Sequence, residues 1–154
     1  DDMKGKKTFE FICTFAQFFF GGWFVFHGLN YFIHFWPQPK GSSVLMREVI
    51  MGLIHSGLFD VIKGIEVVTG VMLLANRMVP IAAILAFPVS FSIAYLNVMA
   101  NHDAYSFGVA VCIIAINGLI VLGHLDKFLP LLVFNNGDPK IDGLKQFLAQ
   151  FTNK

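Results

Sequence analysis

The sequence predicts an all-α membrane protein, a bundle of four transmembrane helices joined by short turns. Only 14% of the 154 residues are charged and 56% are hydrophobic, whereas soluble domains carry roughly a quarter charged residues. The apolar residues also gather in four long blocks, separated by short segments that contain proline, glycine or asparagine. These observations together indicate an integral membrane protein with one domain.

Four segments have the length that a membrane span requires. A bilayer core of about 30 Å is crossed by roughly 20 helical residues. The segments that qualify are residues 9–36, 58–75, 80–100 and 107–125. The transmembrane domain is therefore expected over residues 9–125, between an N-terminal tail (1–8) and a C-terminal tail (126–154). Asp1 and Asp2 precede Met3 and resemble a remnant of an added sequence.

Two amphipathic helices are predicted outside the four spans. The break PQPKGSSV ends the first span, and residues 43–56 follow it. Leu45, Val49, Ile50 and Leu53 share a helical face there, which predicts a short helix lying at the membrane interface. In the tail, a second apolar face is formed by Ile141, Leu144, Phe147, Leu148 and Phe151.

The later spans are separated by short turns. Residues 76–80 form a tight turn, in which Pro80 suits the first turn of the third span. Residues 101–103 form the next turn. Pro88 lies inside the third span, where the ring of a proline removes a hydrogen bond and should kink the helix.

Lysine and arginine placement predicts the orientation, because cytoplasmic loops carry an excess of both. With a cytoplasmic N-terminus, eight of these residues lie inside and two, Lys40 and Arg47, lie outside. The eight are Lys4, Lys6, Lys7, Arg77, Lys127, Lys140, Lys145 and Lys154. Both termini are therefore expected in the cytoplasm, in agreement with an even number of spans.

The second span contains three ionisable residues, Asp60, Lys63 and Glu66, on one face. A charge at the centre of a membrane helix costs about 2.5 to 3.5 kcal/mol on the insertion scale. Lys63 stands three residues from each carboxylate and can pair with either. The remaining acid must be protonated or meet a polar group, so this face should turn toward the bundle interior.

The other spans carry polar residues that can meet this face. In an antiparallel pair of helices, His34 is expected level with Asp60, and His27 level with Glu66. Gln17 and Gly21 extend the same face of the first span inward. The predicted polar pocket is formed by His27, Asn30, His34, Asp60, Lys63, Glu66, Ser90, Asn97 and Asn117. Two interpretations stay open: an ion-pair network that fixes helix packing, and a site for proton handling or for anchoring a ligand.

Several kinds of site are not expected. His27 and His34 lie about 10 Å apart along the helix axis and cannot share one metal ion, so polar packing is favoured over metal or haem binding. Cys13 and Cys112 form no CxxC pair, which argues against a redox dithiol. A net charge of +1 without a basic stripe argues against nucleic acid as a partner. Five glycines should permit close helix approach: Gly21, Gly22, Gly28, Gly64 and Gly70.

The stretches HGLNYFIHF (27–35) and IEVVTGVMLLANRMVPIA (65–82) resemble the DoxX-like (DoxX/DoxD) family of small membrane proteins. The residues that fit its glutamate-glycine-leucine run and basic turn are Glu66, Gly70, Leu73, Leu74 and Arg77. The resemblance covers roughly residues 9–125. It implies a four-helix protein of a bacterial inner or plasma membrane, often a subunit of a redox or quinone-linked system.

Three function classes follow, with no catalytic residue assigned. The first is an accessory subunit of a membrane redox system, whose polar pocket admits a quinone-sized lipophile. The second is a scaffold or assembly factor for other membrane proteins, and the third is a small proton-coupled transporter. Membrane lipids and either a protein partner or further copies of the chain are the expected partners.

Overall fold

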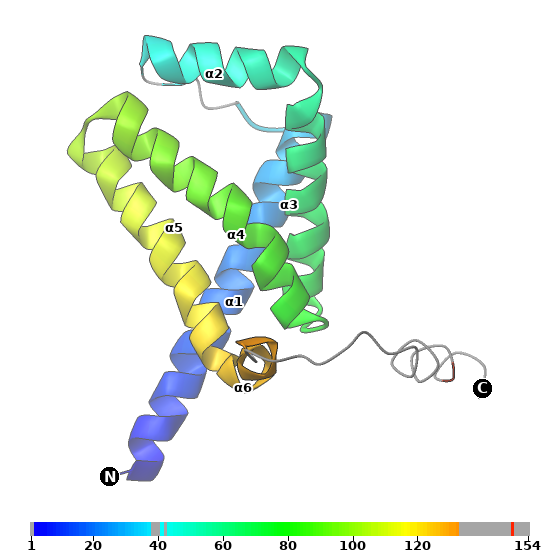
Figure 1. Ribbon diagram of the computed structural model, residues 1–154, viewed down its shortest axis with the longest axis vertical. Coiled ribbons are helices and arrows are strands. Elements are labelled where there is room, and N and C mark those ends of the chain that lie inside the picture. The colour runs from blue at the N-terminus through cyan, green and yellow to red at the C-terminus, as the bar shows by residue number, and fades with distance from the viewer. Residues whose placement is uncertain (1, 38–40, 42, 133–148, 150–154) are drawn as a thin grey trace.

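The fold is built from helices. The computed structural model describes residues 2–37, 41, 43–132 and 149, and every element within this part of the chain is helical. Its four long helices are α1 (Asp2–Ile33), α3 (Leu58–Leu74), α4 (Val79–Leu96) and α5 (Ala104–Gly123). α1 packs against α3 and α5, and α4 packs against the same two helices (Figure 1). The all-α prediction is therefore confirmed for the described residues.

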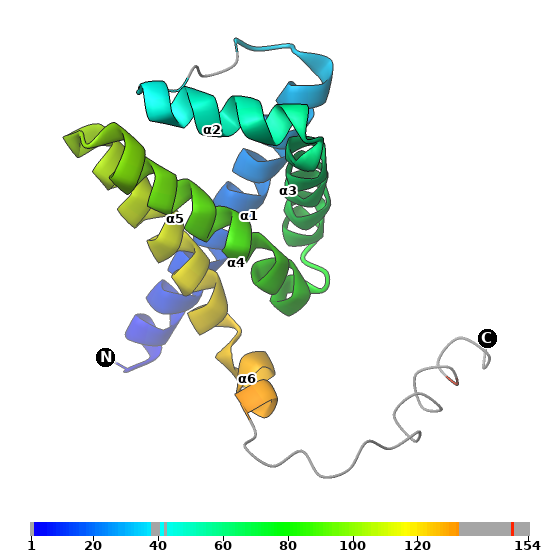
Figure 2. The same cartoon turned by 45° about the horizontal axis from the view of Figure 1, so that its top comes forward.

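Short helices lie at the two ends of these four. α2 (Val44–His55) lies across the end at which α3 begins, and both views show it at an angle to the long helices (Figures 1 and 2). It contacts α3 and the π-helix η1 (Asn97–Asn101), which continues α4. α6 (Leu125–Phe128) and the 3-10 helix η2 (Leu129–Leu132) lie at the opposite end.

Helix ends differ in part from the expected boundaries. α1 begins at Asp2, so the predicted N-terminal tail is helical from that residue on. α2 begins where Ser43 accepts a hydrogen bond from the backbone N–H of Met46 at 3.0 Å, a typical helix cap. α4 runs through Pro88 as one helix. The amphipathic helix predicted over 141–151 lies outside the described residues, apart from Ala149.

Within the part of the chain that the structure describes, three helical segments are long and apolar enough to cross a membrane: Met3–Ile33, Val79–Asn101 and Ala104–Gly123. This composition is typical of an integral membrane protein. α3 is not among them, because it has only 17 residues and carries Asp60, Lys63 and Glu66. It measures about 25 Å along its axis, somewhat less than a bilayer core.

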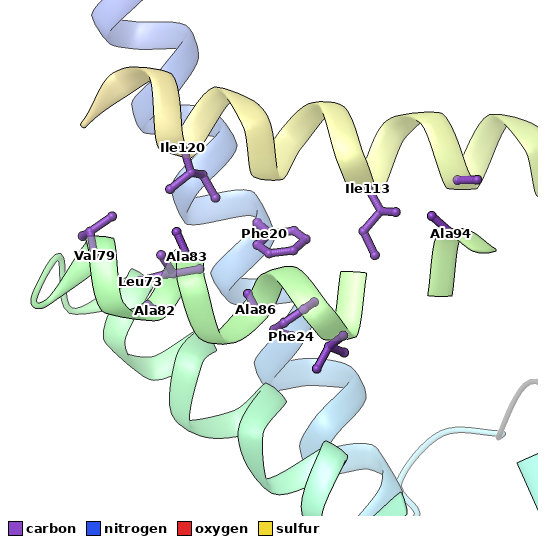
Figure 3. Close-up of a cluster of buried hydrophobic side chains, with 12 residues drawn as sticks. Phe20, Phe24, Leu73, Val79, Ala82, Ala83, Ala86, Ala94, Ile113 and Ile120 are labelled. Carbon is purple, nitrogen blue, oxygen red and sulfur yellow. The ribbon is translucent and has the colours of Figure 1, made fainter. Parts of the chain in front are cut away.

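The core is a cluster of large side chains from α1 and α5 against small ones from α4. Phe20 and Phe24 of α1 are almost fully buried, with ring centroids 4.3 Å apart. Figure 3 shows them beside the alanines of α4 and below Ile113 and Ile120 of α5. The alanines, each at most 1% exposed, are Ala82, Ala83 and Ala86. Their small side chains leave space beside α4 for the two phenylalanine rings of α1.

Glycines bring α1 and α3 into backbone contact. A Cβ atom on Gly70 would lie 2.7 Å from the carbonyl oxygen of Gly21, and one on Gly28 would lie 2.6 Å from Cγ2 of Val67. Three of the five predicted contacts, those of Gly21, Gly28 and Gly70, are thereby confirmed. A Cβ atom added to Gly22 or to Gly64 would meet no atom of another helix within 4 Å, so the prediction is wrong for these two.

Candidate functional site

The site begins with an ion pair inside α3. Glu66 is 2% exposed, and its two carboxylate oxygens accept hydrogen bonds from Nζ of Lys63 at 2.9 and 2.8 Å. The Lys63 side chain is 15% exposed, and its ammonium lies 5.3 Å from the ring centroid of Phe59. Both partners belong to one helix, three residues apart. The charges of the buried pair are therefore compensated within α3 itself.

Asp60 has a different partner. Its carboxylate accepts a hydrogen bond of 2.5 Å from the hydroxyl of Tyr31 on α1. Asp60 is exposed and lies in the first turn of α3. The prediction placed His34 level with Asp60, whereas the structure gives this role to Tyr31, one turn earlier on the same face. The pair joins the ends of α1 and α3.

The three residues of the first span that were predicted for the polar pocket have separate environments. His27 is half-buried, and its ring centroid lies 4.4 Å from the ring centroid of Trp23. Asn30 is 1% exposed and accepts a hydrogen bond of 2.7 Å from the backbone N–H of Trp36. His34 is exposed beyond the end of α1, at a φ of 57°. The Asn30 side chain thus binds the backbone of the segment that follows α1.

Ser90 and Asn117 connect α4 with α5. Both are buried, at 0% and 2% exposure, and Nδ2 of Asn117 donates to Oγ of Ser90 at 3.4 Å. On the other side of the core, Nε2 of the buried Gln17 donates to the carbonyl of Leu73 at 2.9 Å and to Oδ1 of Asn76 at 3.0 Å. Asn76 was not predicted as a partner, because its place in a turn suggested only a loop role.

We expect the Ser90–Asn117 contact to contribute a small but measurable coupling. Hydrogen bonds between membrane helices average about 0.6 kcal/mol in double-mutant cycles. A cycle of Ser90→Ala and Asn117→Ala, followed by denaturation in detergent, should give a coupling of this size. Ser92→Ala is the matched control, since the Ser92 hydroxyl donates to the Pro88 carbonyl within α4. Equal coupling of Asn117 to both serines would contradict the assignment.

Polar residues also meet at the turn between η1 and α5. The carboxylate of Asp103 accepts hydrogen bonds from the backbone N–H and the hydroxyl of Ser106, at 2.9 and 2.7 Å. Asn101 donates to the Ser106 hydroxyl at 3.0 Å and to Oδ1 of Asn97 at 3.4 Å, while Oδ1 of Asn101 is buried without a hydrogen-bond partner. The spacing Asp103-x-x-Ser106 is a helix-cap signal that the sequence contains.

A cavity of about 310 Å³ adjoins this turn. It is lined by Asn97, Val98, His102, Asp103, Ala104 and Phe107. Of the residues predicted for the polar pocket, Asn97 is in this lining. The structure therefore distributes the predicted residues over several groups, namely the Lys63–Glu66 pair, the Tyr31–Asp60 pair, the Ser90–Asn117 contact and the cavity edge. Their role in binding a ligand stays a prediction.

Asp103 is expected to make stability depend on pH in the acidic range. The hydrogen bonds from Ser106 lower the pKa of its carboxyl below the usual value of about 3.9. Its stabilising effect is therefore complete above that value and is lost as the pH falls through the lowered pKa. The difference in Tm between the wild type and Asp103→Asn should be constant above about pH 5 and shrink below about pH 4. A difference that does not change with pH would contradict this role.

The described residues contain no group of three or more His, Cys, Asp or Glu side chains that could hold a metal ion. Comparisons with family models, with curated proteins and with solved structures found no match for this chain.

Proposed function

We propose that the chain is an accessory subunit embedded in a membrane, which supports a larger complex. In this proposal α1, α3, α4 and α5 form a four-helix transmembrane bundle, and α2 lies at the outer interface. The membrane is a bacterial inner or plasma membrane, and both ends of the described chain face the cytoplasm. The polar residues at the helix contacts hold the bundle together.

The observation that carries the proposal is the pairing of the buried polar side chains. Glu66 bonds to Lys63, Gln17 to the end of α3, and Asn117 to Ser90. In a membrane interior such groups are retained where they pair with one another or line a path. Pairing within the bundle favours a packing role over proton transfer.

The outer surface offers room for a partner within the membrane. Two rows of neighbouring aromatic rings run along exposed helix faces. The rows are Phe11, Phe15, Phe19 and Trp23 on α1, and Phe87, Phe91 and Tyr95 on α4. Such faces suit acyl chains as well as helices of another subunit.

The test is purification of the tagged chain from its native membrane in mild detergent, followed by protein mass spectrometry. We expect a stoichiometric protein partner, which is retained in the Glu66→Gln variant because Glu66 lies inside the bundle. Recovery of the chain without any other protein would contradict the proposal. Ion-driven uptake that Glu66→Gln abolishes would support the transporter instead.

A quinone-binding subunit is the second candidate, and the cavity at the η1–α5 turn favours it. His102 and Asn97 offer hydrogen-bond donors for carbonyl oxygens, and Phe107 and Val98 offer apolar walls. A volume of about 310 Å³ suits the head of a small lipophile.

Lipid extracts of the purified chain would test this candidate. We expect quinone enrichment relative to the bulk membrane, lost in His102→Ala and retained in His55→Ala, where an exposed histidine of α2 is changed. Equal quinone content in the wild type and His102→Ala would contradict binding in this cavity.

A further inference from the structure

The cavity at the turn between η1 and α5 has walls from two helices. It lies at the end of the bundle that α2 crosses, and both views show this turn beside α2 (Figures 1 and 2). Asn97 and Val98 of η1 contribute one wall. Ala104 and Phe107, from the first turn of α5, contribute the other. Asp103 stands in the chain between these walls and also lines the cavity of about 310 Å³.

The carboxylate of Asp103 gives this cavity a negative charge. With histidine neutral at pH 7, Asp103 is the one charged residue in the lining. Among the described side chains, no cation lies within ion-pair distance of it. Nor do the two helix ends supply a net charge, because the partial negative charge where η1 ends offsets the partial positive charge where α5 begins. The Asp103 carboxylate accepts two hydrogen bonds from Ser106, and a carboxylate has room for about four.

The polar network at the same turn is short of hydrogen-bond donors. The side-chain amide of Asn97 donates to the carbonyl of Ile93 at 2.8 Å, and the hydroxyl of Ser106 donates to Asp103. Asn101 donates to Asn97 and to Ser106, while its own Oδ1 is buried without a hydrogen-bond partner. Rotation of the Asn101 amide would not correct this, because its Oδ1 would then face Oδ1 of Asn97. A ligand that donates hydrogen bonds therefore suits this turn.

We propose that the cavity binds a primary ammonium group, which in a membrane is the headgroup of an ethanolamine phospholipid. The ammonium pairs with the carboxylate of Asp103, and its three N–H groups supply donors at a turn that is rich in acceptors. Val98 and Phe107 offer apolar surface to the carbon atoms beside the nitrogen. A quaternary ammonium has the same charge but no N–H group, so it meets the charge without the hydrogen bonds.

This ligand is an alternative to the quinone considered for the same cavity. A quinone carries no charge that could meet the carboxylate of Asp103, whereas an ammonium does. Binding of the ammonium requires neither a protein partner nor a redox role, so it goes beyond the accessory function and can fail or succeed independently of it.

Native mass spectrometry of the full chain can measure the preference. The chain is incubated at pH 7 with equal amounts of phosphatidylethanolamine and phosphatidylcholine that carry the same acyl chains. Both lipids are zwitterionic, so they differ only in the N–H groups of the ammonium. We expect phosphatidylethanolamine to be enriched about fivefold, which corresponds to one hydrogen bond of about 1 kcal/mol. Asp103→Asn should bring the ratio close to one, and α5 is retained because asparagine also caps helices.

Four further variants separate this site from diffuse attraction and from quinone binding. Glu48→Gln removes an exposed negative charge from α2, at the same end of the bundle, and should retain the enrichment. Ala104→Leu fills the cavity without a change of charge and should abolish the enrichment. Ala115→Leu, at an exposed alanine of the same helix, should retain it. His102→Ala should also retain it, whereas a quinone would be lost.

Added ethanolamine identifies the source of the ammonium. Displacement of the phospholipid by ethanolamine at equal concentration would show that a soluble amine is sufficient, and retention would show that the lipid is the ligand. Both results support an ammonium site. Equal or absent binding of the two phospholipids, or an enrichment that persists in Asp103→Asn or in Ala104→Leu, would overturn the proposal.

Discussion

Replacement of Gly70 by alanine is expected to destabilise the protein strongly. The new Cβ would lie 2.7 Å from the carbonyl oxygen of Gly21 and 2.9 Å from the backbone nitrogen of Val25. Backbone atoms cannot turn aside as a side chain can, so α1 and α3 must separate along their contact. Overpacking of this kind costs about 1–3 kcal/mol, to be measured by chemical denaturation in detergent.

Gly64→Ala is the matched control. Gly64 lies on the same helix, and a Cβ atom added there would meet nothing within 4 Å. Alanine favours helix over glycine by about 1 kcal/mol, so this variant should be neutral or more stable than the wild type. Equal destabilisation by the two substitutions would show that helix propensity, and not the contact between α1 and α3, explains the loss at Gly70.

Removal of the Glu66 carboxylate should have the other large effect. Glu66→Ala leaves the ammonium of Lys63 without the partner that bonds it at 2.8 and 2.9 Å. Breaking a buried ion pair from one side costs about 3–5 kcal/mol, and the 15% exposure of Lys63 places this pair near the lower figure. Denaturation in detergent and the melting temperature both measure the loss.

The double variant Lys63→Met with Glu66→Leu should recover most of that stability, since it removes both charges at similar volume. Asp60→Asn is the control, because Asp60 is exposed and its Tyr31 hydroxyl partner can bond to an amide oxygen. A loss in Asp60→Asn as large as that in Glu66→Ala would mean that charge in α3 matters regardless of burial. Failure of the double variant to recover stability would mean that the pair does more than balance charge.

Secondary structure followed closely from the hydrophobic blocks and turn residues. The predicted spans 80–100 and 107–125 correspond to α4 with η1 and to α5, because Pro80 and the turn at Asp103 mark where the helices begin. The start of α1 was less predictable. Lys4, Lys6 and Lys7 appeared to end the span, but lysine is a good helix former and the helix continues through these residues.

Pairing among polar residues was harder to predict than their location. Periodicity assigned each residue to a face and a depth of its own helix, which was sufficient to turn Glu66 inward. It did not fix the rotation of one helix against another, and that rotation decides whether Tyr31 or His34 meets Asp60. The same uncertainty explains why Gly21 and Gly70 meet while Gly22 and Gly64, on other sides of α1 and α3, do not.

The path of α3 decides between two topologies. If α3 crosses the bilayer together with the three longer apolar segments, the start of α1 and α6 lie on the same side of the membrane. If only those three segments cross, the two lie on opposite sides. The buried Lys63–Glu66 pair favours a crossing, since it balances the charge that makes α3 less apolar than its neighbours.

Labelling of single cysteines with a membrane-impermeant maleimide distinguishes the two. In a background of Cys13→Ser and Cys112→Ser, sealed vesicles of one orientation are labelled at Lys4→Cys, Lys127→Cys or Arg47→Cys, three positions that are exposed in the structure. Four crossings predict that Lys4→Cys and Lys127→Cys react from one side and Arg47→Cys from the other. Reaction of Lys4→Cys and Lys127→Cys from opposite sides would contradict the four-helix transmembrane bundle.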